Sequence, residues 1–397
     1  MADFTRIVEL QEHAPLRLSS QTLSAAAGEL LWQQYDRERG VINVDFPSPK
    51  TGNQWQITSR GWVGHLPLSP DLGFHLRPKV PLDNLFQMLE YAYRLQSFTV
   101  LDGLTASESV PDFYRRLARL LARRVLERGR NGFHRAYLAR QERLPYVRGQ
   151  LDLNRHRPWT PTLACHYEEH TADIADNQIL AWTLQIIAQS RLCDEATQLL
   201  VRRAYRSLNG HVSLIPFTAG ACVDRFYTRL NQDYHPLHAL CHFFLKHSGP
   251  GHRLGEHTMV PFLVNMSHLY EQFVAAWLEV NLPAPWTVRV QEQVTVGRQN
   301  ELRFNVDLVL YDRHNQPRLV LDTKYKAAER PASADVQQIT TYARLRDCSE
   351  AILVYPQVPG TPLDVEVGDV RLRTLSFSLE GDLEAHGQAF LRALALS

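Results

Sequence analysis

The stretch FNVDLVLYDRHNQPRLVLDTKYK, residues 304–326, constrains the fold of this chain more than any other. Two apolar segments, 302–311 and 318–326, flank the turn-forming run DRHNQP, and this pattern predicts a pair of buried strands joined as a hairpin. Asp307, Asp322 and Lys324 nevertheless lie inside the predicted strands. Charged side chains are almost never buried without a partner, so something must pair with these three.

Strand geometry indicates what that partner is. Successive side chains of a strand point to opposite faces, so Asp322 and Lys324 share a face, and in a hairpin Asp307 can lie close to Asp322. Two carboxylates at such a short distance repel each other unless one is protonated or a cation lies between them. Mg²⁺ takes about six oxygen ligands at about 2.1 Å, and carboxylates and waters supply them. The pattern therefore predicts a site for Mg²⁺ or Mn²⁺, with Lys324 placed to orient a water and to offset charge on a phosphate.

Two predicted helices supply further candidates. In the helix over 265–280, Glu271 lies on the flank of the apolar face, where it can reach over a sheet, although a capping or salt-bridging role explains it equally well. In the helix over 331–347, Gln338 and Tyr342 are four residues apart and therefore share a face. They could contact DNA or the carboxylates, and ordinary helix packing is the alternative.

The rest of the chain predicts an α/β protein of several domains. Residues 1–100 are rich in short strands with turn residues between them, and residues 101–260 show mainly helical periodicity. Residues 261–397 read as a helix, three antiparallel strands, a second helix and the short buried strand AILVYP, which predicts a module with a mixed sheet.

Charge and composition exclude several classes of protein. The net charge of +1 gives no general attraction to nucleic acid, but residues 111–160 hold 13 Arg and four acidic residues, a local charge of +9. This block could meet DNA, an acidic partner or only water. There is no long apolar run and no signal peptide, so we expect a cytoplasmic protein without a membrane span. No nucleotide-binding loop of the Walker type is present.

Zinc is a minor alternative. The five cysteines contain no CxxC pair, which argues against a cysteine-rich zinc module. His235, His238 and His242 fall near one face of a predicted helix, with Cys241 beside them, but helix packing explains such a set more often than zinc does.

An acidic residue on one strand, then Asp-x-Lys on the next, between two helices, resembles the PD-(D/E)xK nuclease fold. Asp307 matches the first acidic position, and Asp322 and Lys324 match the acidic and lysine positions of DTK. Glu271 resembles the helical Glu of many members, and QITTY, from Gln338 to Tyr342, resembles the QxxxY element of the RecB-like branch. The departure is a valine at position 306, where the family often has proline; that proline shapes the entry of the strand and takes no part in the chemistry.

A larger part of the chain is similar to the McrC family, the nuclease subunits of McrBC-type modification-dependent restriction systems. The individual motifs are loose, but their order is specific. They are GWVGHLPLSPDLGFHLRPKVPLDNLFQMLEYAYRL, LPYVRGQLDL, ADIADNQIL and MSHLYEQFV.

The resemblance implies a C-terminal restriction-endonuclease-like module that cleaves double-stranded DNA, with Asp307, Asp322, the carbonyl of Thr323 and Glu271 as metal ligands. It also implies a partner, a McrB-like AAA+ GTPase ring that reads modified DNA and whose hydrolysis the chain stimulates. Residues 1–100 would dock on that ring, with the loop at 46–54 as a candidate tip.

Two other functions stay open. One is an autonomous RecB-like repair nuclease, which would cut DNA without a motor. The other is a non-catalytic scaffold that activates an NTPase ring. The complete set of Asp307, Asp322 and Lys324 argues against the scaffold, because decayed nucleases commonly lose one of these residues.

Overall fold

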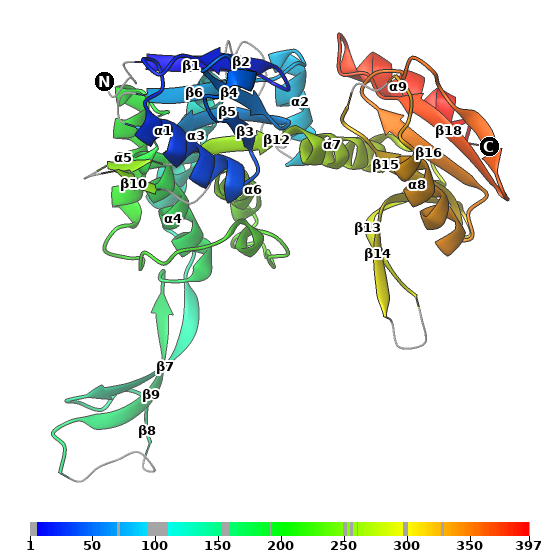
Figure 1. Ribbon diagram of the computed structural model, residues 1–397. Coiled ribbons are helices and arrows are strands. Elements are labelled where there is room, and N and C mark those ends of the chain that lie inside the picture. The colour runs from blue at the N-terminus through cyan, green and yellow to red at the C-terminus, as the bar shows by residue number, and fades with distance from the viewer. Residues whose placement is uncertain are drawn as a thin grey trace. The chain divides into compact units, whose positions relative to one another are not determined.

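The structure is a computed structural model of the 397-residue chain, and it describes residues 6–69, 72–93, 110–152, 159–190, 192–248, 252–254, 257–259, 261–296, 301–326 and 329–396. It divides into two compact units (Figure 1). One consists of residues 111–261, and the other joins residues 4–110 to residues 262–397. The boundary predicted at residue 100 lies outside the described residues.

Four helices form the body of the described part of residues 111–261, a region in which the sequence predicts mainly helical structure. Because the apolar residues of the first helix recur at helical spacing, Phe113, Leu117 and Leu121 are fully buried. Phe243 packs edge-on against Phe113, with ring centroids 6.0 Å apart. The elements of the body are α3 (Val110–Arg130), α4 (Ala175–Gln189), α5 (Glu195–Leu208), α6 (Tyr234–His247), the 3-10 turn Ala219–Cys222 and the hairpin of β10 (His252–Leu254) and β11 (His257–Met259).

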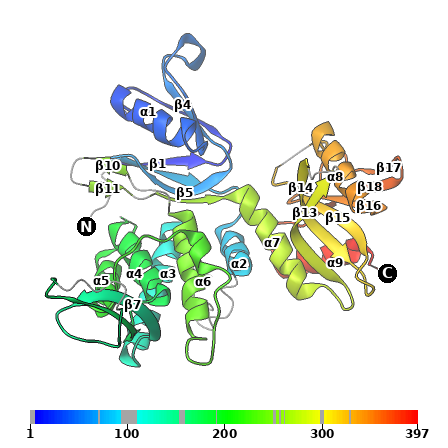
Figure 2. The same ribbon diagram turned by 90° about the horizontal axis from the view of Figure 1, so that it is seen from below.

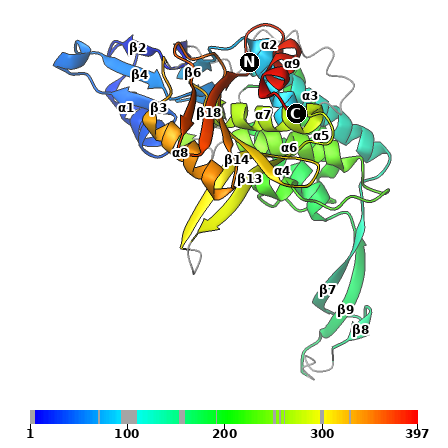
Figure 3. The ribbon, with the colours of Figure 1, turned by 90° about the vertical axis from the view of Figure 1, so that its right-hand side faces the viewer.

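A three-stranded antiparallel arm extends from these helices (Figure 3). Its strands, in the order β7-β9-β8, are β7 (Ala136–Leu144), β9 (Leu163–Thr171) and β8 (Gln150–Leu151). Strands β7 and β9 were not predicted from the sequence. No residue of β7 is buried, and in β9 only Ala164 and Cys165 are, so neither strand has the apolar face that identifies a half-buried strand.

The other unit begins with two small sheets. One has the strand order β1-β6-β5-β12 and the other β2-β4-β3. They share a core with Leu31, Tyr35, Trp55 and Phe74. The elements are β1 (Arg6–Gln11), β2 (Pro15–Leu18), α1 (Ala25–Leu31), the π-helical turn Trp32–Arg37, β3 (Ile42–Asp45), the 3-10 turn Pro49–Thr51, β4 (Trp55–Ser59), β5 (Trp62–Pro67), β6 (Leu72–Arg77) and β12 (Phe262–Asn265).

Strand β12 comes from much later in the chain than its neighbour β5. The two approach closely at Gly64, where a Cβ atom would lie 2.1 Å from the carbonyl oxygen of Phe262, so only glycine fits. The chain then passes directly from β12 into α7 (Met266–Asn281), whose N-cap is Asn265. The N-terminal sheet is thus continuous with a helix of the C-terminal module, and α2 (Leu82–Ala92) packs on α7.

The C-terminal module is built on a six-stranded mixed sheet with the order β13-β14-β15-β16-β18-β17. Strands β13, β14 and β15 are antiparallel, and β15, β16 and β18 are parallel. The predicted order of helix, three strands, helix and strand is confirmed, and the chain continues beyond it with β17, β18 and α9. The elements are β13 (Thr287–Val296), β14 (Leu302–Tyr311), β15 (Pro317–Thr323), α8 (Ser333–Leu345), β16 (Glu350–Tyr355), β17 (Asp364–Val367), β18 (Val370–Ser376) and α9 (Leu383–Leu394).

Helices cover both faces of this sheet. Figure 2 shows α8 on one side and α7 and α9 together on the other. The α8 side has an apolar core that includes Val320, Ile339 and Leu353. On the other side, the ring of Phe377 contacts both Trp277 and Phe390. Among the described helices, none combines the length and the apolar character that crossing a membrane requires.

Candidate active site

The two acidic residues predicted on neighbouring strands do converge. Leu308 of β14 pairs with Leu321 of β15 in antiparallel register, so the same register places Asp307 opposite Asp322. Opposed residues of an antiparallel pair share a face, here the face that α8 covers, because Val320 belongs to the core under α8. Asp322 is fully buried and Asp307 is partly exposed.

Lys324 lies on the same face and contacts both this pair and α8. Its Nζ is 2.7 Å from Oδ2 of Asp322 and donates to Oε1 of Gln338 at 3.3 Å. The amide of Gln338 in turn donates to the hydroxyl of Tyr342 at 2.9 Å. The structure therefore joins five of the predicted residues: Asp307, Asp322, Lys324, Gln338 and Tyr342.

Electrostatic repulsion between the two carboxylates is strong. Burial, followed by the charge of Asp322, raises the pKa of Asp307 to about 8. Burial also raises the pKa of Asp322, although the Lys324 amine opposes this. For Lys324, burial disfavours the charged form, but the neighbouring carboxylates, Asp322 first, outweigh burial and raise its pKa. The lysine is thus held as a cation beside two carboxylates that compete for protons.

Glu271 lies near the site but is engaged elsewhere. Its charge is one of the causes of the raised pKa of Asp307. Its carboxylate accepts a short hydrogen bond from Gln291 of β13 and lies 3.6 Å from Nδ1 of His268. Burial alone would raise the pKa of Glu271, but the hydrogen bonds from His268 and Gln291 lower it. Glu271 is therefore ionised beside the cluster, with a salt-bridging role already in place.

The backbone at Thr323 also faces the site. The N–H of Lys324 donates to the carbonyl of Val354 in β16 at 2.8 Å. Because the C=O and N–H of a trans peptide point in opposite directions, the Thr323 carbonyl is directed away from β16, toward the strand that carries Asp307. The Thr323 side chain points to the other face of the sheet, and its buried hydroxyl has no hydrogen-bond partner within the described residues.

The donor set fits a hard divalent cation. Oδ2 of Asp322 is paired with the Lys324 amine, whereas its buried Oδ1 has no hydrogen-bond partner in the part of the chain that the structure describes. Such an unpaired buried oxygen calls for a further partner. No three His, Cys, Asp or Glu side chains among the described residues form a ready-made metal site. Two carboxylates with waters suit Mg²⁺, which keeps several waters and is often bound through one or two carboxylates.

The sequence analysis missed Asp335 in the first turn of α8. Its charge contributes to the raised pKa values of Asp322 and Lys324, and its carboxylate lies 2.5 Å from Nζ of Lys326. The available signal was its spacing, three residues before Gln338 and therefore on the same helix face.

The structure speaks against zinc at the histidine-rich helix α6. Nδ1 of His238 is 2.8 Å from the hydroxyl of Tyr227, and Nε2 is 3.0 Å from the carbonyl of Asp176. Both ring nitrogens are therefore in use, and burial lowers the pKa of this histidine to about 4. The histidine packs the helix into its unit.

Much of the arginine block is also internally paired. Arg119 pairs with Asp194, Arg128 with Asp233, and Arg140 and Arg148 both with Glu169. These ion pairs neutralise part of the local charge of +9, so the block is not a bare cationic surface.

Comparisons with solved structures give similar folds. One is McrC bound to McrB AAA+ hexamers of Thermococcus gammatolerans, in a half-complex of a tetradecameric assembly; it is 18% identical, covers 98% of this chain and 99% of that chain, and has a TM-score of 0.59. A chain of the McrBC complex from the same organism is 18% identical, covers 70% of this chain and 88% of that chain, and has a TM-score of 0.45. At such identity the likeness concerns the fold.

The comparison with curated proteins finds no match. The family described as "McrBC 5-methylcytosine restriction system component" matches residues 49–356, which is well over half of the chain and includes Asp307, Asp322 and Lys324. The chain therefore belongs to the family of McrBC 5-methylcytosine restriction system components.

Proposed function

We propose that this chain is the Mg²⁺-dependent (or Mn²⁺-dependent) DNA endonuclease subunit of a McrBC-type restriction system, with a PD-(D/E)xK module as its catalytic part. The convergence of Asp307, Asp322 and Lys324 on one face, where the end of β15 lies beside the middle of β14, carries the proposal. A surface hairpin would leave these side chains in water, whereas here Asp322 is fully buried. Because buried charges need partners, the arrangement indicates a cation site.

Each residue of the cluster has its own role in the proposed reaction. Asp307, Asp322 and the carbonyl of Thr323 would hold the cation, which supplies charge stabilisation at the scissile phosphate and lowers the pKa of the attacking water. The Lys324 ammonium orients that water and stabilises negative charge on the phosphoryl oxygens. Gln338 fixes the Lys324 amine through its 3.3 Å hydrogen bond. In-line attack would leave 5′-phosphate and 3′-hydroxyl ends.

Two of the predicted residues act more remotely. Tyr342 orients the amide of Gln338 by accepting its hydrogen bond, and is itself buried in the core under α8. Glu271 adds negative charge near Asp307. In the metal-bound state it would act on a water ligand or stay bonded to Gln291, and its existing hydrogen bonds favour the second role.

The partner would be a McrB-like AAA+ GTPase ring in the cytoplasm, which delivers modified double-stranded DNA and whose hydrolysis this chain stimulates. McrC in the similar solved structure is bound to McrB hexamers. The strands of residues 1–100, including the loop at 46–54 between β3 and β4, are one candidate contact with the ring. The arm is a second candidate, because Tyr137, Tyr146 and Trp159 are largely exposed on it.

Cleavage by a reconstituted complex tests the proposal. Asp322→Ala should abolish cleavage of modified DNA in the presence of Mg²⁺, the partner and GTP, while binding of the partner and stimulation of GTP hydrolysis persist. Asp369→Ala is the matched control, since this Asp is on the surface of the same module, paired with Arg344. Retained cutting by Asp322→Ala would disprove the site assignment. Cutting by the wild-type chain alone would favour the autonomous nuclease, and stimulation without any cutting would favour the scaffold.

A further inference from the structure

A buried carboxylate lies behind the candidate active site, on a residue from the start of the chain. Glu12 follows β1 directly and its side chain is completely buried. Its Oε2 accepts hydrogen bonds from the N–H of Lys79 at 3.2 Å and from the hydroxyl of Tyr325 at 3.1 Å. Its Oε1 is 3.5 Å from Nε2 of His13. Removing a carboxylate from water is costly unless it is hydrogen-bonded, so these few contacts hold Glu12 strongly in place.

Tyr325 connects this carboxylate to the catalytic strand. It is the residue after Lys324, beyond the end of β15 at Thr323, and its side chain lies on the face of the sheet that α7 covers. There its ring lies 6.0 Å from that of Tyr270 in α7. The segment is fixed to the sheet on one side by the bond from Lys324 N–H to Val354, and the next anchor along the chain is the hydroxyl of Tyr325.

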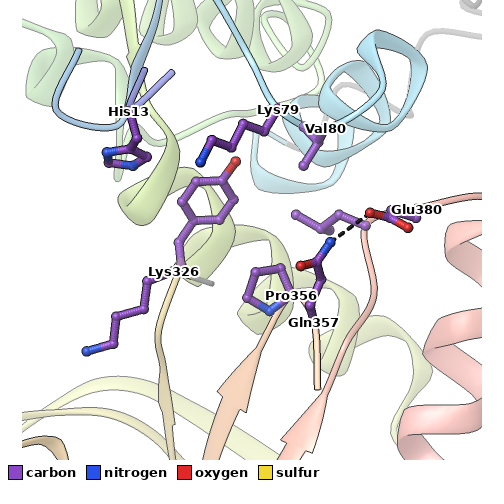
Figure 4. Close-up of a pocket in the computed structure, with 9 residues that line it drawn as sticks. His13, Lys79, Val80, Lys326, Pro356, Gln357 and Glu380 are labelled. Atoms are coloured by element: carbon purple, nitrogen blue, oxygen red, sulfur yellow. Dashed lines mark hydrogen bonds between the residues drawn. The ribbon is translucent and has the colours of Figure 1, made fainter. Parts of the chain in front are cut away.

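Packing alone does not immobilise Tyr325. A pocket of about 80 Å³ opens beside it, at the carboxyl ends of β15, β16 and β18, with Lys79, Val80 and Pro356 among its walls. Figure 4 shows Lys79 and His13 on the N-terminal side of this pocket and Pro356, Gln357 and Glu380 on the side of the C-terminal module. Since a side chain beside open space has room to move, the hydrogen bond to Glu12 decides where Tyr325 lies.

We propose that Glu12 is a positioning residue of the nuclease, which acts through Tyr325 to fix the backbone of residues 322–325 and hence the amine of Lys324. The N-terminal sheet then contributes to the active site by positioning Lys324. This inference rests on the proposed nuclease function. Without the hydrogen bond, the segment relaxes toward the pocket and the amine leaves the position set by Asp322 and Gln338. A displacement of about 1 Å at a catalytic group lowers a rate about 100-fold.

The test uses the full chain with its AAA+ partner, GTP, Mg²⁺ and modified DNA, under single-turnover conditions. Tyr325→Phe should lower the cleavage rate about 10- to 100-fold, with the DNA concentration for half-maximal rate and the stimulated GTP hydrolysis unchanged. Glu12→Ala should lower the cleavage rate by the same factor as Tyr325→Phe. Glu12→Gln keeps an acceptor oxygen for the tyrosine and should stay within about threefold of wild type. The double variant Glu12→Ala with Tyr325→Phe should be no slower than either single variant, because both remove the same contact.

Tyr91→Phe is the matched control. The Tyr91 hydroxyl donates to Glu384 at 3.5 Å, so this variant also removes a Tyr–Glu contact between α2 and the C-terminal module, away from the catalytic strand. It should cleave like wild type.

The inference is overturned if Tyr325→Phe cleaves at the wild-type rate, if the two effects multiply in the double variant, or if Tyr91→Phe is equally slow. Should Glu12→Ala fail to fold, the comparison of Tyr325→Phe with Tyr91→Phe still decides. The proposed function fails separately, through a wild-type complex that does not cleave or an active Asp322→Ala.

Discussion

Asp307→Asn should stabilise the metal-free protein while it abolishes cleavage. In the folded chain the pKa of Asp307 is raised to about 8 by burial and by Asp322. In the unfolded chain this carboxyl group titrates near 3.9. The folded state therefore retains a proton that the unfolded state has lost, so the stability of the wild-type protein is greatest below about pH 4 and falls as pH rises toward 8.

The size of the effect follows from this shift. A pH of 7 lies about three units above the pKa of Asp307 in the unfolded chain. At about 1.4 kcal/mol per unit, the proton that the folded state retains lowers the free energy of unfolding by at most about 4 kcal/mol. Water entry and relaxation at the partly exposed Asp307 reduce this effect, so we expect a gain of about 2 kcal/mol from a neutral amide. For a unit of this size the gain corresponds to a rise of about 4–8 °C in Tm.

Thermal unfolding at pH 7 with and without Mg²⁺ measures both the stabilisation by Asp307→Asn and the loss of metal binding. Without metal, Asp307→Asn should melt higher than wild type. Addition of Mg²⁺ should raise the Tm of wild type, because the cation binds only the folded state, and should have little effect on the variant. Asp312→Asn is the matched control. Asp312 is outside the site, and hydrogen bonds from the N–H groups of Gln316 and His314 lower its pKa, so its replacement should give no gain. A lower Tm for metal-free Asp307→Asn, or equal shifts by Mg²⁺ in both proteins, would refute the reasoning.

Three further predictions follow from single contacts. Gln338→Ala should slow single-turnover cleavage about tenfold with GTP hydrolysis unchanged, because the Lys324 amine loses its hydrogen-bond acceptor on α8. Gly387→Ala should destabilise the protein in urea unfolding by about 1–3 kcal/mol, since the new Cβ would lie 2.1 Å from the indole of Trp277; this overpacking outweighs the gain of about 1 kcal/mol that alanine normally gives in a helix. Burial lowers the pKa of His238 to about 4, so the stability of residues 111–261 should be full above about pH 6.5 and fall by up to about 3 kcal/mol as pH drops to 4; His238→Phe should remove that slope in melting curves.

The elements of the C-terminal module from α7 to β16 were predictable because each has a local signal. Charged residues interrupt an otherwise apolar hairpin at Asp307, Asp322 and Lys324. Period-two alternation places Asp322 and Lys324 on one face, and the pairing of the hairpin brings Asp307 opposite Asp322. Gln338 and Tyr342 follow from helical spacing, and the hydrogen bond between them confirms that they share a face.

Other features have no local signal. The arm was not predicted because β7 has no buried residue and β9 has only Ala164 and Cys165, so neither strand shows an apolar face. Glu12 and Tyr325 are 313 residues apart, and no periodicity in either segment indicates that they meet. The pairing of β12 with β5 is equally distant in sequence, and only the glycine at position 64 marks the close approach. Contacts of this kind depend on how elements pack in three dimensions, which a single sequence does not display.

The N-terminal strands are joined to the C-terminal module at two places near the candidate site. In the first, β12 is a strand of the N-terminal sheet and continues into α7, the helix that carries Glu271. In the second, Glu12, the residue after β1, accepts a hydrogen bond from Tyr325, the neighbour of Lys324. A third tie, from the amide of Asn84 to the carbonyls of Leu379 and Gly381, fixes α2 to the segment after β18. Strands, a helix and buried hydrogen bonds form rigid connections. A ring that docks on the N-terminal strands would therefore change the distances between the side chains of the candidate site. Uncoupling by Tyr325→Phe should therefore lower cleavage by the docked complex without weakening the docking itself.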